Sequence, residues 1–224
     1  MSTRALLILR ISLMLLAVFN LAILGVRLWP WQDVPNLPGN GAAGIDPAIC
    51  LLGYIGLIFW IASVRREPMR SALFSGAMLG LAGGLPLAAQ VMLKAMPAAI
   101  NTFHPVLVSL CLLLTAGVVW GIAGWRGSRI AGSVGVGMFS AIWSAMVSCL
   151  IACAAVLMEM YLAAGPVPEA QDAWSQYEGL AIGTQATQTL LHSLSAICWF
   201  LLVGPLVGGA LGLAFGFFGQ PQKD

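Results

Sequence analysis

The sequence predicts an all-α membrane protein: one polytopic bundle of six transmembrane helices with both termini in the cytoplasm. Of the 224 residues, 60% are hydrophobic and only 8% are charged, whereas soluble proteins carry about 25% charged residues. The apolar residues form long runs separated by short polar breaks, and about 18 apolar residues already suffice to cross the hydrocarbon. Basic residues occur in alternate breaks, which is typical of cytoplasmic connections.

The apolar runs define a single integral domain over residues 1–224, with predicted spans at residues 5–28, 48–64, 71–100, 103–125, 130–164 and 180–218. Residues 30–47, rich in Pro and Gly, and residues 165–179, which carry acidic groups, are predicted outer loops. At 1.5 Å per residue the last two runs would be roughly 50 to 60 Å long, against about 30 Å of hydrocarbon. We therefore expect them to tilt, to kink or to project outside as a hairpin.

The orientation follows from the basic residues near the span ends. The two predicted outer loops contain no Lys or Arg. The basic residues that mark cytoplasmic segments are Arg4, Arg10, Arg65, Arg66, Arg70, Arg126, Arg129 and Lys223. This distribution predicts an integral protein of the bacterial inner (cytoplasmic) membrane.

Glycines recur every four residues in two of the predicted spans, a glycine-zipper pattern. Such spacing places them on one helix face and lets a neighbouring backbone approach closely. We interpret these stripes as helix-packing surfaces, with a pore lining or a sliding transport interface as the alternative. Pro205 is a predicted hinge in the sixth span, because proline removes one helical hydrogen bond. The packing glycines are Gly76, Gly80, Gly84, Gly204, Gly208, Gly212 and Gly216.

Polar residues inside spans are the default candidates for function, because lipid makes them costly unless they face protein or water. The topology places the candidates toward the outer half of the protein, where they could converge on a proton- or ion-coupled site. The alternative is that Lys94 and Glu159 extend to the outer headgroups and that His192 is a helix-contact residue. The candidates are Glu159, Lys94, His192, Gln188, Gln185 and Arg27.

Metal and cofactor sites have little support in the sequence. Cys149 and Cys153 share a helix face, but two thiols without a third ligand are typical packing residues. A haem between His104 and His192 would need both rings at one depth. We expect no metal and no cofactor. Two tryptophans, Trp143 and Trp199, lie deep in their spans and are expected to pack between helices.

These patterns favour a non-catalytic membrane component that packs with partner membrane proteins or with copies of itself in the lipid bilayer. The alternative function is a small-solute or ion transporter that uses the outer polar site. An enzyme is not expected, since no nucleophile, acid–base or phosphate-binding motif occurs. Nucleic acid is excluded as a partner, because the basic residues are scattered and the net charge is only +2.

Overall fold

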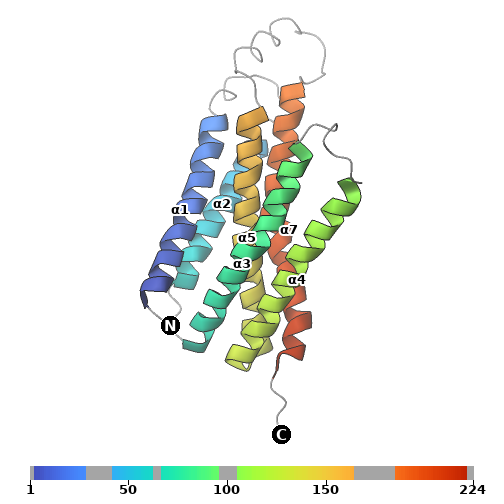
Figure 1. Cartoon of the computed structure of the whole chain (residues 1–224). Helices are drawn as coiled ribbons and strands as arrows, with labels where there is room; N and C mark the ends of the chain where they lie inside the picture. The colour runs from blue at the N-terminus through green and yellow to red at the C-terminus, as the bar shows by residue number, and fades with distance from the viewer. Residues whose placement is uncertain (1–2, 29–41, 63–66, 96–104, 164–184, 221–224) are drawn as a thin grey trace, which may run out of the picture.

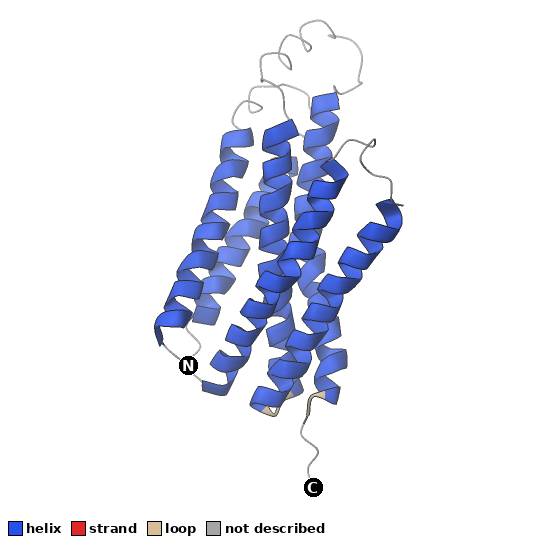
Figure 2. Ribbon diagram, in the orientation of Figure 1, coloured by secondary structure: helices blue, strands red, loops and turns tan. Residues whose placement is uncertain are grey.

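The computed structural model describes residues 3–28, 42–62, 67–95, 105–163 and 185–220. Within these ranges the chain is all-helical, without strands (Figure 2). The helices are α1 (Thr3–Leu28), α2 (Ala42–Ala62), α3 (Glu67–Ala95), α4 (Pro105–Ala131), α5 (Val134–Ala163) and α7 (Gln185–Phe218). Residues 30–41 and the second predicted outer loop, 165–179, lie outside the described residues. Residues 42–47, predicted as the end of the first outer loop, are instead helical and form the start of α2, with Pro47 inside the helix.

Five of the described helices are long and apolar enough to cross a membrane, and they indicate an integral membrane protein. They are α1, α3, α4, α5 and α7. The apolar part of α2 is shorter, covering Pro47–Ile61. The predicted second span therefore coincides with a helix, while the number of crossings depends on whether α2 also traverses the bilayer.

The connection between α4 and α5 is tighter than the sequence predicts. Helix α4 continues to Ala131, so Arg126 and Arg129 lie on its last turns instead of in a loop. Gly132 then adopts a φ of 65°, and its N–H donates to the Ser128 carbonyl at 2.8 Å. This left-handed glycine ends the helix because a side chain would be strained there.

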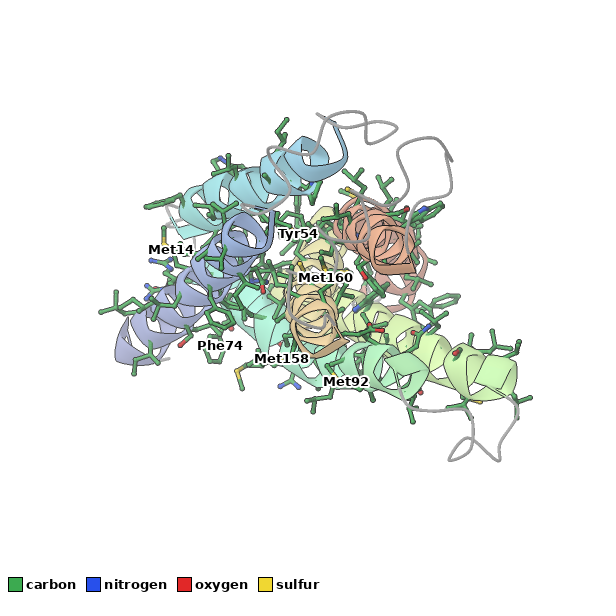
Figure 3. All side chains as sticks on the ribbon, turned by 90° about the horizontal axis from the view of Figure 1, so that it is seen from above. Met14, Tyr54, Phe74, Met92, Met158 and Met160 are labelled. Carbon is green, nitrogen blue, oxygen red and sulfur yellow. The ribbon has the colours of Figure 1, made fainter. Side chains whose placement is uncertain are left out.

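Helix α5 is the centre of the bundle. It packs extensively against α3, α4 and α7, while α1 and α2 form a hairpin that contacts α5 and α7 from one side (Figures 1 and 3). Of its membrane-length segment, 78% is buried, against 22% for that of α4. The start of α1 and the end of α7 lie at the same end of the bundle (Figure 1).

The outward faces of the helices are apolar, as expected for a surface in contact with lipid. Trp143 is buried in the core, in line with the packing role expected for it. Trp199 is 65% exposed and lies on the outside of α7, which corrects the expectation that it packs between helices. Helix α4 is packed more closely along its second half, because residues 106–115 are exposed or only partly buried.

Candidate functional site

The backbone places the predicted polar residues at one end of the bundle. Arg27 and Lys94 lie in the last turns of α1 and α3, and Glu159 lies near the end of α5. Gln185, Gln188 and His192 lie in the first turns of α7, which begins at that same end (Figure 1). These residues therefore lie at a similar height along the bundle, as the residues of one shared site would have to.

Only Glu159 has a described side chain among these candidates. It is half-buried and takes part in an interaction within the protein. The side chains of the other five candidates, and of His104, lie outside the described residues. Whether the group converges therefore stays a prediction, and so does the haem alternative. Among the described residues, no group of three or more His, Cys, Asp or Glu is placed to hold a metal ion.

The described interior instead holds a row of serines on α5. Ser140, Ser144 and Ser148 follow one another at intervals of one helical turn, and all three are fully buried. The Ser140 hydroxyl donates to the Ala72 carbonyl of α3 at 3.0 Å. The Ser148 hydroxyl lies 2.8 Å from the Gly80 carbonyl of α3 and 3.0 Å from the Ser144 carbonyl. The bonds to Ala72 and Gly80 tie α5 directly to the backbone of α3.

A tryptophan connects α4 to the same row. The indole Nε1 of Trp120 donates to Ser148 Oγ at 3.0 Å, and both groups are buried. Ser148 therefore joins three helices through one hydroxyl group. The Ser144 hydroxyl, one turn away, has no hydrogen-bond partner. Because an unpaired buried polar group is costly, Ser148 contributes to stability whereas the Ser144 hydroxyl does not.

Glycines allow α3 and α5 to approach each other at the serine row. A Cβ atom built on Gly76 would lie 2.5 Å from the Ser140 carbonyl oxygen, and one on Gly80 would lie 2.5 Å from that of Ser144. A Cβ on Gly84 would lie 2.5 Å from Ile151 Cδ1. Real Cβ atoms do not approach other atoms so closely, so the two backbones can be this near only where α3 has no side chain.

The glycines of α7 face α5 in the same way. A Cβ on Gly208 would meet the Ala145 side chain at 2.6 Å, and one on Gly212 would meet that of Ala141 at 2.5 Å. Gly204 lies against Cys149 Sγ. Gly216 lies against Ser128 Oγ of α4, where a Cβ would be 2.8 Å away. Small residues thus line α5 on both sides.

The hairpin of α1 and α2 is joined to the core by two buried hydrogen bonds. Asn20 Nδ2 donates to the Leu150 carbonyl of α5 at 3.0 Å. The Tyr54 hydroxyl donates to the Leu201 carbonyl of α7 at 2.7 Å, and Figure 3 shows Tyr54 between these helices. Leu201 precedes Pro205 by four residues, so its carbonyl lacks the helical donor that residue 205 would normally supply. The Tyr54 hydroxyl supplies the missing donor to the Leu201 carbonyl.

The hairpin also carries three glycines that are not used for packing. A Cβ on Gly25 of α1, or on Gly53 or Gly56 of α2, would have no atom within 4 Å. Exposed apolar side chains surround the two α2 glycines, including Ile49, Leu52 and Trp60. In contrast, the described α4 glycines at 117, 121, 124 and 127 all face neighbouring helices.

Sequence reasoning missed the polar contacts that cross between helices. The four-residue spacing of the α5 serines is visible in the sequence and, like the glycine stripes, indicates a row of small residues on one helix face. The Tyr54 contact is not visible, because it requires knowing which residue of α2 faces the turn before Pro205. The predicted hinge residue lies within α7, which runs without interruption through Pro205.

Comparison with protein-family models, curated proteins and solved structures finds no significant match to this chain.

Proposed function

We propose that the chain is a non-catalytic, six-span component of a membrane assembly, with both termini in the cytoplasm and with the α1–α2 hairpin facing a partner helix. The observation that carries this proposal is the contrast between two sets of glycines. Glycines of α3 and α7 pack against α5, whereas Gly53 and Gly56 of α2 are open on the outside. Because glycines have no side chain, a lipid-facing surface that contains them allows another transmembrane helix to approach closely.

The composition of the interior supports a packing role over a chemical one. The buried polar residues in the described ranges are Asn, Gln and Ser, and none of them is charged. Most of the described polar contacts join one helix to another, as in the Asn20, Tyr54, Trp120 and Ser148 bonds. Such contacts define the register of the helices and thereby a fixed outer surface. The cytoplasmic membrane of a bacterium is the proposed location.

Photo-crosslinking in native membranes tests the partner proposal. A photoreactive amino acid at Leu52 of α2 should yield a protein adduct, whereas the same group at Leu114 of α4 should react with lipid only. Both positions are well exposed, at 55% and 60%. Replacing Gly53 and Gly56 with leucine should abolish the α2 adduct without changing the thermal stability of the chain.

An adduct of twice the chain mass would identify a second copy as the partner, and any other protein mass would identify a different subunit. Equal crosslinking at Leu52 and Leu114, or an adduct that survives the glycine replacements, would contradict the proposed docking surface. The comparison of Leu52 with Leu114 tests whether α2 has a protein neighbour, and the glycine replacements isolate the role of the open glycines.

Transport is the second candidate, favoured by the placement of the six polar candidates at one end of the bundle. A half-buried carboxylate at Glu159 would be the coupling group. The test is proton flux into proteoliposomes under an imposed pH gradient. If the chain is a proton-coupled transporter, it should show a flux that Glu159→Gln abolishes without changing the melting temperature. Flux no higher than in empty liposomes, or a flux unchanged by the substitution, would exclude Glu159 from any proton-coupled mechanism.

A further inference from the structure

The α1–α2 hairpin is the least extensively packed part of the bundle. Helices α3, α4, α5 and α7 contact one another extensively, either directly or through α5. The hairpin makes much sparser contacts, mainly between α1 and α5 and between α2 and α7. Its apolar side chains, such as Leu13, Leu51 and Ile58, join the core cluster around Leu150 and Cys153. Apolar contacts within a bilayer have lipid as a competitor, so they bind the hairpin less firmly than they would in water.

The two hydrogen bonds across this boundary differ in kind. The Leu150 carbonyl, which accepts from Asn20, lies in the middle of α5, and residue 154 is an alanine whose N–H can also reach it. The Leu201 carbonyl, which accepts from Tyr54, has no such second donor because residue 205 is proline. Inside a bilayer no water replaces the missing donor. The Tyr54 bond is therefore the contact whose loss leaves a backbone group unpaired.

We propose that the Tyr54 hydroxyl is a latch that holds the α1–α2 hairpin on the proline break of α7, so that the hairpin separates from the four-helix core as a unit when this bond opens. The latched state is favoured because only Tyr54 satisfies the Leu201 carbonyl. A competing donor at that carbonyl would release the hairpin.

The latch makes a specific prediction for a pair of substitutions. Tyr54→Phe removes the hydroxyl and keeps the ring, so the Leu201 carbonyl loses its donor. In a Pro205→Ala background the new backbone N–H at residue 205 can bond that carbonyl, and Tyr54→Phe should then have little effect. Thr115→Val is the matched control, since the Thr115 hydroxyl bonds the Cys111 carbonyl within α4 and does not touch the hairpin.

The experiment uses the full chain with a specific protease site inserted between Val64 and Arg65. After the folded protein is cut in detergent, affinity capture of the C-terminal part measures how long the α1–α2 hairpin stays bound. We expect Tyr54→Phe to speed release about tenfold, the effect of leaving one buried acceptor unpaired. Release from the Pro205→Ala/Tyr54→Phe chain and from the Thr115→Val chain should stay near that of the unsubstituted chain.

An equilibrium unfolding titration of the uncut variants separates a latch from an ordinary stabilising contact. The latch requires faster hairpin release in Tyr54→Phe together with its reversal by Pro205→Ala. A loss of stability in Tyr54→Phe without faster release would overturn the proposal, and so would faster release that Pro205→Ala fails to reverse. Unchanged release in Tyr54→Phe would overturn it as well.

Discussion

Replacing Gly80 with alanine should separate α3 from α5. The added Cβ would lie 2.5 Å from the Ser144 carbonyl oxygen, 2.7 Å from Val147 Cβ and 3.1 Å from Ser144 Cα. Two of these three neighbours are backbone atoms of α5, which cannot move aside as the end of a side chain could. The helices must therefore move apart at the centre of their contact.

The size of the effect can be worked from the contacts at this point. Overpacking of a tight core costs about 1 to 3 kcal/mol. The movement also weakens the Ser148 bond to Gly80 and the Ser140 bond to Ala72, and membrane hydrogen bonds average about 0.6 kcal/mol each. Alanine recovers roughly 0.5 to 1 kcal/mol of helix propensity. The net loss should be about 1 to 3 kcal/mol.

Gly53→Ala is the matched control, because it makes the same chemical change at an open position of α2. It should leave the free energy of unfolding unchanged or raise it by up to about 1 kcal/mol, through helix propensity alone. Reversible unfolding of the purified protein in mixed micelles, followed by circular dichroism, measures both variants. Equal stability of Gly80→Ala and Gly53→Ala would refute the reasoning that Gly80 is needed for close packing.

Two further predictions concern the same interface. Ser148→Ala should lower the free energy of unfolding by about 1 to 3 kcal/mol, because it leaves the buried Trp120 N–H without an acceptor. Ser144→Ala removes a hydroxyl that has no partner, so thermal melts should show it to be neutral or stabilising. The opposite order of stability would contradict the hydrogen-bond assignment. Gly212→Leu should reduce the yield of folded protein in detergent extraction, because the new side chain would clash with Ala141 and Met138. Gly56→Leu is the control and should not reduce the yield. Equal yields would show that Gly212 is not needed for helix packing.

The all-helical architecture could be predicted from the sequence because its signal is local. Long apolar runs interrupted by Pro- and Gly-rich segments define helices without reference to their neighbours, and the described helices coincide with the predicted spans to within several residues. The prediction was wrong at residues 126–131, because residues 126–129 were expected to form a connection and residues 130–131 to begin the fifth span, whereas all six belong to α4. Helix α4 continues through this stretch to Ala131, where Arg129 lies over the Trp125 ring, 5.1 Å from its centroid, and Gly132 then supplies the turn.

The contacts between helices could be predicted only in part. The spacing of Gly76, Gly80 and Gly84 identifies one face of α3, but only the three-dimensional arrangement identifies α5 as the helix opposite it. The Tyr54 bond to Leu201 joins residues 147 positions apart and depends on the relative rotation of two helices. A single sequence holds no record of that rotation. For the same reason, the convergence of Glu159 with the polar residues of α7 remains a prediction.

The six-span topology depends most directly on α2, because the orientation of every later helix changes if α2 does not cross the bilayer. Fusion of a phosphatase that is active only outside the cytoplasm, placed after residue 40 or after residue 66, measures this crossing. A six-span protein predicts an active fusion after residue 40 and an inactive one after residue 66. Equal activity of the two fusions would show that α2 does not cross, and would contradict both the six-span topology and the cytoplasmic placement of the two termini.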